Sequence, residues 1–233
     1  MEQTLKITSV LADPTRYYIY QFILNNHREV TVQDIADKFE IHPNVARLHL
    51  SKLEDVKMIV SESKKTGKGG RPSRLYRLSD EVIQLQFPFR DYQLLAKISL
   101  QALSSLGAQG KDALTQAGKV FGKELIQQKL IMSSTSVHQL SFQDKIDLLN
   151  EAAKMSGFSP EFHATEEDGK IILQVFNCPF KELAIADPDV ICTMHNAFLI
   201  GMFESVFENV ELKEFENMFS QCEYCAYKAI VTK

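Results

Sequence analysis

Four cysteines are the residues of this chain best suited to chemistry, and all of them lie in its last quarter. They are Cys178, Cys192, Cys222 and Cys225, separated by 13, 29 and 2 residues. The close Cys222–Cys225 pair is a local chelate, because two thiolates at this spacing can bind one metal ion without backbone strain. Thiolates in a tetrahedral arrangement hold either zinc or an iron–sulfur cluster, so residue type leaves both open.

His195 lies one helical turn after Cys192 on the same predicted helix face. A zinc site with three cysteines and His195 is feasible, and so is a four-cysteine cluster with His195 beside it. The alternative is four inert thiols, since free cysteine often packs as a small hydrophobic residue. We favour a shared site, because Cys178 and Cys192 flank a short element that can fold them toward one point.

A thiol–disulfide enzyme using Cys222 and Cys225 is a further alternative. Catalytic pairs of this spacing usually stand at a helix start, where the helix dipole lowers the thiol pKa. Here Tyr224 and the alternating residues after Cys225 indicate a strand instead. The sequence also contains no Ser-His-Asp grouping, Walker loop or GxGxxG motif. We therefore predict that the protein is not an enzyme.

The elements around the cysteines predict an α+β sensor domain at residues 136–233. Alternating residues predict two strands around the turn signal Asp168-Gly169. Asp187-Pro188 combines a helix cap with proline at the first helical position and starts a long helix to about Glu208. Two more strands, near 210–219 and 224–232, complete a small antiparallel sheet.

The front of the chain, residues 1–85, has the order of a helix-turn-helix domain. Asp13-Pro14 starts a helix that ends near Asn26, Thr31 caps a second helix, and Pro43 opens a third that runs to about Asp55. In the third helix we expect Ala46, Leu50 and Leu53 in the core and His49 as a packing residue. The other side carries residue types that reach base edges and phosphates: Asn44, Arg47, Ser51 and Lys52.

A basic, glycine-rich segment follows between two short alternating stretches, which is typical of the wing of a winged helix. Its lysines and arginines can neutralise phosphates, and its glycines allow a close approach to the DNA backbone. A solvated flexible loop is the other interpretation. Residues 64–74 contain no acid, and the basic residues are Lys64, Lys65, Lys68, Arg71 and Arg74.

The charge distribution agrees with a DNA-binding front. The whole chain has a formal net charge of -4, but residues 1–79 carry 13 basic and 9 acidic residues, against 13 and 21 in the remainder. We therefore expect only the front to meet double-stranded DNA. No apolar run is long enough to cross a membrane and no secretion signal opens the chain, so we predict a cytoplasmic protein without membrane contact.

Residues 86–135 are predicted to link the two domains through helices. Phe87-Pro88-Phe89 breaks regular structure, and helical periodicity follows at Tyr92–Leu106 and Lys111–Gln127, separated by Gly107 and Gly110. The apolar positions of these helices exceed the needs of one small core. We therefore predict a homodimer with its interface in this linker, and core packing is the alternative.

Three stretches of the front resemble the ArsR/DeoR-type winged-helix repressors: Leu11–Arg16, His49–Leu53 and the Gly-Arg-Pro…Tyr-Arg-Leu wing. The resemblance implies a dimer on a two-fold symmetric operator. The chain departs from these proteins at Lys57, where they often have glycine after the recognition helix. We therefore expect a turn of different shape there.

The last part resembles the sensor half of SufR-type repressors. The residues that carry the resemblance are Asn177-Cys178-Pro179-Phe180, Cys192, the long helix with Phe198 and Glu204, and Cys225–Ile230. The resemblance implies a repressor with an iron–sulfur cluster and assigns Cys178, Cys192 and Cys225 as ligands. Cys222 departs from the family's closing motif; it is either the fourth ligand or a sign of zinc. The alternative function is a winged-helix regulator that responds to zinc or to a small molecule, with structural zinc and an apolar pocket as the sensor.

Overall fold

The structure is a computed structural model, and it describes residues 2–64, 73–167, 169–220 and 222–231. Its contacts divide the chain into two compact units, Met1–Arg90 and Asp91–Lys233. Helices combine with small antiparallel sheets in both units, which confirms the predicted α+β class. Within the described ranges, no helix is both long and apolar enough to span a membrane.

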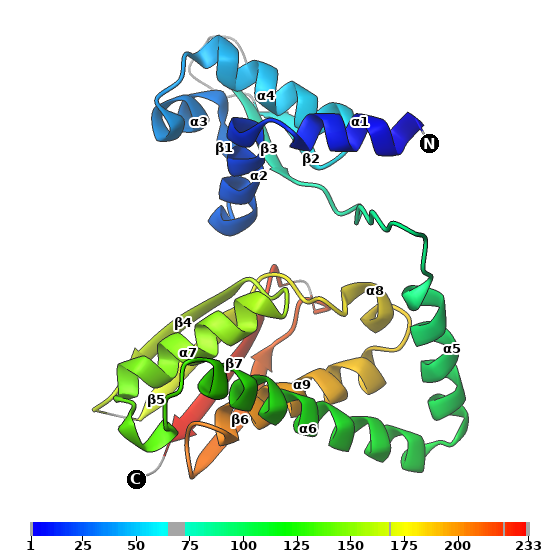
Figure 1. Cartoon of the computed structure of the whole chain (residues 1–233), viewed down its shortest axis with the longest axis vertical. Coiled ribbons are helices and arrows are strands. Elements are labelled where there is room, and N and C mark those ends of the chain that lie inside the picture. Colours follow the sequence, from blue (N-terminus) through cyan, green and yellow to red (C-terminus); the bar gives the residue numbers. More distant parts are fainter. Residues whose placement is uncertain (1, 65–72, 168, 221, 232–233) are drawn as a thin grey trace. The chain divides into compact units, whose positions relative to one another are not determined.

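The first unit contains the predicted helix-turn-helix and wing (Figure 1). Its sheet has the strand order β1-β3-β2, with Ile59 opposite Leu78 at the base of the wing hairpin. The elements in chain order are α1 (Glu2–Leu11), α2 (Pro14–Asn26), β1 (Val30–Thr31), α3 (Val32–Phe39), α4 (Pro43–Asp55), β2 (Ile59–Lys64) and β3 (Ser73–Leu78).

Local caps start α2 and α3 where the sequence predicts them, whereas α1 was not predicted. The Asp13 carboxylate accepts from the Arg16 backbone N–H at 2.9 Å. Thr31 and Asp34 cap each other's backbone N–H groups in a capping box. The core between the helices and the sheet includes the predicted Ala46, Leu50 and Leu53, each completely buried. The core-facing side of α4 is thereby confirmed.

The turn after α4 keeps the shape that glycine would give it, contrary to the expectation from Lys57. Lys57 has a φ of 61°, in the left-handed region that favours glycine. Its ammonium group reaches the Glu81 carboxylate at 3.0 Å. The turn therefore keeps its left-handed residue although a non-glycine residue costs about 1 kcal/mol of backbone strain there.

The second unit packs helices against one face of a four-stranded antiparallel sheet of order β4-β5-β7-β6 (Figure 1). Ile171, Leu173 and Tyr227 on the covered face are almost fully buried. The elements in chain order are α5 (Tyr92–Ser105), α6 (Ala108–Met132), a 3-10 turn (Val137–Gln139), α7 (Phe142–Met155), β4 (Pro160–Thr165), β5 (Lys170–Val175), α8 (Lys181–Ala184), α9 (Pro188–Glu204), β6 (Val210–Glu216) and β7 (Cys225–Val231).

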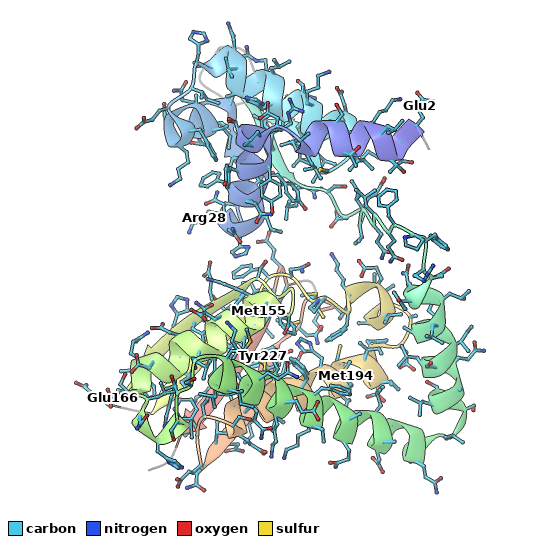
Figure 2. All side chains as sticks on the ribbon, viewed as in Figure 1. Glu2, Arg28, Met155, Glu166, Met194 and Tyr227 are labelled. Atoms are coloured by element: carbon cyan, nitrogen blue, oxygen red, sulfur yellow. The ribbon has the colours of Figure 1, made fainter. Side chains whose placement is uncertain are left out.

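Helices α6 and α9 approach each other closely because glycines line their contact. A Cβ atom added at Gly122 would lie 2.0 Å from the Phe198 carbonyl oxygen, and one at Gly201 would lie 2.1 Å from that of Lys119. Gly118 meets the backbone of Met194, which Figure 2 labels, in the same way. Only glycine permits this backbone-to-backbone packing. The helix that carries Cys192 and His195 is thus held rigidly against α6.

The linker helices belong to the second unit and differ from the prediction in one respect. Gly110 does not separate two helices but lies inside α6, which begins at Ala108. A Cβ at Gly110 would lie 1.8 Å from the Leu103 carbonyl oxygen. Gly110 is therefore used for a close approach of α6 to the end of α5, a tertiary role that helical periodicity does not reveal. Gly107, with a φ of 61°, makes the turn between them.

Candidate functional site

The outer face of α4 presents polar side chains to solvent. Asn44, Arg47 and Lys52 are exposed, and Ser51 is half-buried. The Arg47 guanidinium donates to the Asn44 side-chain oxygen at 2.9 Å, which holds both groups on one face. The Lys52 ammonium lies 3.9 Å from the Asp55 carboxylate, one turn further along the helix. Groups of this kind on an exposed helix can read base edges and neutralise phosphates.

Leu48 is a residue of this face that the sequence analysis did not single out. It is 56% exposed and stands four residues after Asn44 and three before Ser51, so the three share one side of α4. An exposed leucine among polar residues suits apolar contact with a thymine methyl group. The helical spacing of Leu48 from Asn44 and Ser51 could have placed it on this face from the sequence alone.

Of the predicted basic residues of the wing, Arg74 is the one with described side-chain contacts. Its guanidinium pairs with the Glu54 carboxylate at 3.0 Å, donates to Ser61 at 2.6 Å and lies over the Tyr76 ring. Arg74 thereby ties the wing to the end of α4. The Lys64 backbone ends β2, while its side chain and Lys65, Lys68 and Arg71 lie outside the described residues.

His49 is a packing residue, as predicted. It is only 8% exposed, and its Nδ1 atom has no hydrogen-bond partner among the described residues. Burial lowers the pKa of His49; the nearby Asp13 carboxylate opposes this shift and the Arg16 guanidinium adds to it. A neutral, enclosed imidazole is not positioned to read a base.

Cys178 and His195 meet in the interior of the second unit. The Cys178 sulfur lies 3.8 Å from the His195 Nδ1 atom, and the two side chains come from the loop after β5 and from α9. The His195 ring stacks on Phe158 with centroids 5.0 Å apart, and its buried Nε2 atom has no described partner. Burial lowers the pKa of His195 to about 4 and raises the pKa of Cys178 to about 12. Both groups are neutral at physiological pH.

Cys225 and Cys192 lie close enough to Cys178 for the three thiols to influence one another electrostatically. Burial raises the pKa of each, and the pKa of Cys178 rises further through Cys225 and Cys192. Cys225 Sγ accepts from the Met218 backbone N–H at 3.4 Å and also interacts with the Tyr227 hydroxyl, from a side chain labelled in Figure 2. The predicted ligands Cys178, Cys192 and Cys225 therefore lie in one region of the second unit, on a loop, a helix and a strand.

Cys222 has different surroundings. Its sulfur contacts the Ser220 carbonyl oxygen at 3.9 Å, and its side chain is half-buried. Among the residues that the structure describes, no three His, Cys, Asp or Glu side chains are grouped to hold a metal ion. The thiols therefore share a region without forming a preassembled metal centre.

Two polar residues near the thiols were not anticipated from the sequence. The Asn217 amide interacts with the Cys192 thiol and donates to the Glu214 carboxylate, and that carboxylate raises the pKa of both Cys192 and Cys225. Glu214 lies two residues after the inward-facing Leu212 of β6, so strand alternation could have placed it on the covered face. Asn217 comes after the strand ends and carried no such signal.

The comparisons with known proteins identify the first unit. Residues 11–62 match a family described as "Helix-turn-helix domain". The match spans α2, α3, α4 and the first half of the wing hairpin. No curated protein sequence matches the chain.

Several solved structures are similar to the chain at low identity. A trafficking protein particle complex subunit 3 from Naegleria fowleri, covalently bound to palmitic acid, has 14% identity and a TM-score of 0.43; the match covers 60% of this chain and 97% of that one. The phenol-responsive sensory domain of the transcription activator PoxR, with phenol, has 13% identity and a TM-score of 0.45; that match covers 79% and 89%. Likenesses at these scores carry no argument about function.

Three observations indicate a helix-turn-helix: the order of the helices, the division of α4 into a buried and an exposed side, and the family match. Residues 11–62 form a helix-turn-helix domain, and the chain is supported as a DNA-binding transcriptional regulator.

Proposed function

We propose that the protein is a sequence-specific transcriptional repressor that binds a two-fold operator as a homodimer, under the control of an iron–sulfur cluster. The observation that carries the DNA-binding part is the exposed α4 face with Asn44, Arg47, Leu48 and Ser51, backed by a fully buried core side. The dimer is implied by the resemblance of the front to ArsR/DeoR-type repressors, and the repressor role and the cluster are implied by the resemblance of the last part to SufR-type proteins.

Each group at the DNA has a separate task. Asn44 and Arg47 are positioned to read base edges in the major groove, where Asn pairs with adenine and Arg with guanine. The basic residues of the wing supply counter-charge to phosphates and contribute affinity without sequence information. Arg74 holds the wing to α4 through Glu54, so the two DNA contacts keep a constant relation.

The thiols supply the donor type that a cluster needs, and Cys178, Cys192 and Cys225 lie within electrostatic range of one another in the second unit. Cys178, Cys192 and Cys225 would hold the cluster, with Cys222 as the fourth ligand. When bound, an iron–sulfur cluster supplies a redox-sensitive link between the elements that hold it. Because burial disfavours the thiolate form of all three, a cation is required to keep them deprotonated here. The protein's own part is to hold these thiols in one region of the second unit and to limit their access to water.

Zinc held by three cysteines and His195 is the second candidate, and one contact favours it. His195 lies beside Cys178, and its burial keeps the imidazole neutral, the form that binds metal. A thiol–disulfide enzyme has less support. Cys225 begins strand β7 rather than a helix, and burial raises its pKa, the opposite of an activated thiol.

Purification without oxygen tests the choice of metal. We expect a brown protein with broad absorption near about 400 nm and iron and sulfide in equal amounts. Colourless protein with stoichiometric zinc would show that the second candidate, the zinc site, is correct and the cluster is not. The Cys178→Ser and Cys225→Ser variants should lose the metal, and a cysteine-to-serine change at Cys222 shows whether the fourth thiol is needed.

Binding to DNA tests the regulator itself. Preferred sites are selected from random double-stranded DNA, and the affinity of the metal-loaded and metal-free protein is then measured on the best site. A two-fold symmetric site with unequal affinities is the expected result. Equal affinities of the metal-loaded and metal-free protein would show that the metal does not regulate DNA binding, while the DNA-binding function itself would stand.

A further inference from the structure

Helix α5 leaves most of its apolar surface uncovered. None of its residues is buried, although the helix consists mainly of apolar side chains. Figure 1 shows α5 at the end of the second unit, with α6 leading away from it toward the sheet. The exposed fractions are 66% for Tyr92, 52% for Leu94, 60% for Leu95, 56% for Ile98 and 60% for Leu106 at the helix end.

The spacing of these residues makes one broad face. At 100° per residue, the exposed apolar residues and Ala102 lie together on one side of the helix. The half-buried residues Ala96, Leu100 and Leu103 form a neighbouring stripe, and α6 is the main element in contact with α5. A narrow polar strip with Gln93, Lys97 and Gln101 completes the circumference. One helix neighbour therefore covers only a small part of the apolar surface.

The size and charge of this α5 face fit a second copy of the same chain. Five large side chains that are half or more exposed leave roughly 500 Å² of apolar surface per copy, the size of the largest apolar patch on a typical monomer, which is often a functional surface. Two copies bury about 1,000 Å², the lower limit for a specific interface. Lys97 is the only charged residue between Tyr92 and Ser105, so two copies can pair without like-charge repulsion across the contact.

We propose that the α5 face pairs with the α5 face of a second copy in an isologous, two-fold contact. The inference deepens the proposed function and rests on it in one respect, since a two-fold operator requires two DNA-binding units in one assembly. The first unit ends at Arg90 and α5 starts at Tyr92, so pairing of α5 joins two DNA-binding units through a short connection in each chain.

Sedimentation velocity of the full-length, metal-free protein without DNA tests the pairing. We expect a dimer at micromolar concentration, and Ile98→Glu should weaken it by about 100-fold or more, because the contact would bury an unpaired carboxylate in each copy. Gln93→Glu adds the same charge on the polar strip of the same helix and should leave the dimer intact. Because Ile98 is 56% exposed within one chain, the variant should keep its circular-dichroism melting curve. Should it unfold, Leu95→Gln is measured in its place and should weaken the dimer by about 10-fold or more, because the contact would bury an unpaired amide in each copy.

A wild-type protein that sediments as a monomer at roughly 100 µM would overturn the proposal. A monomer is the result expected if α5 is covered by another part of its own chain or binds a different protein. A dimer that persists in both Ile98→Glu and Leu95→Gln would also overturn it. The test contains no DNA, so a dimer that fails to bind any selected operator contradicts the proposed function and leaves the α5 pairing standing.

Discussion

The two units of this protein begin their helices in the same way but place their functional groups oppositely. Asp13-Pro14 in the first unit and Asp187-Pro188 in the second are equivalent helix starts. The first unit exposes its polar side chains on α4, where a macromolecule can reach them. The second buries Cys178, Cys225 and His195 among aromatic rings. A surface that reads DNA must be accessible, whereas a sensing centre gains selectivity from enclosure.

The largest expected effect comes from Gly122→Val, which tests whether the two units are independently stable. The new side chain would collide with the Phe198 backbone, 2.0 Å from the position of its Cβ. We expect the second unit to lose about 4 kcal/mol of unfolding free energy, while the first unit keeps its own melting transition. Thermal unfolding followed by circular dichroism measures both.

Ala113→Val is the matched control for this variant, because Ala113 is an exposed residue of the same helix. It should cost only about 0.5 kcal/mol, the difference in helix propensity. If Gly122→Val instead shows one melting transition at a lower temperature, the two units unfold together, and the claim that they are independently stable is wrong.

Thiol reactivity in the metal-free, reduced protein sharpens the contrast in accessibility. Because burial raises the pKa of Cys178 from 9.0 to about 12, its thiolate fraction at neutral pH falls about 1,000-fold. We expect iodoacetamide to label the half-buried Cys222 and Cys192 first and Cys178 last. Mass spectrometry of the peptides gives the rates, and labelling in denaturant should make them equal. Equal rates in the folded protein would show that the thiols are not enclosed.

The exposed site should respond to substitution without loss of stability. Arg47→Ala removes a proposed base-reading group from the surface, so we expect operator affinity to fall by about 10- to 100-fold with an unchanged melting temperature. Lys6→Ala on α1, with the same change in charge, should have little effect on either. Fluorescence anisotropy with the selected operator measures the affinities. An equal loss in both variants would indicate a general charge effect instead of base reading.

The smallest effect concerns the one buried histidine of the first unit. Since burial lowers the pKa of His49 below 6.5, the unfolded chain takes up a proton before the folded unit does. The stability that the neutral imidazole contributes is therefore complete above pH 6.5 and is lost as the pH falls through the range between the unfolded and the folded pKa. Denaturant unfolding of the first unit at several pH values should show this loss, and His49→Gln should reduce it. An unchanged slope in His49→Gln would assign the pH dependence to other groups.

Features that depend on a few neighbouring residues could be predicted from the sequence. The caps at Asp13, Thr31 and Asp187 satisfy backbone N–H groups within three residues along the chain, so their residue types suffice to locate the helix starts. The buried side of α4 follows from helical period alone, and the structure confirms it at Ala46, Leu50 and Leu53. The helix-turn-helix of residues 11–62 was accessible for the same reason.

Only the tertiary structure decided the features that depend on distant segments. Gly110 marks a helix boundary by residue type, yet it lies inside α6, where the lack of a side chain allows the close approach of the Leu103 carbonyl. The presence of Cys178, Cys192 and Cys225 in one region depends on β5 and β7 being neighbours in the sheet, so that thiols up to 47 positions apart act on one another electrostatically. Spacing along the chain favoured Cys222 as a partner of Cys225, whereas in the fold Cys192 acts electrostatically on Cys225 and the Cys222 sulfur contacts the Ser220 carbonyl oxygen. Distance in space is set by strand order and not by sequence separation.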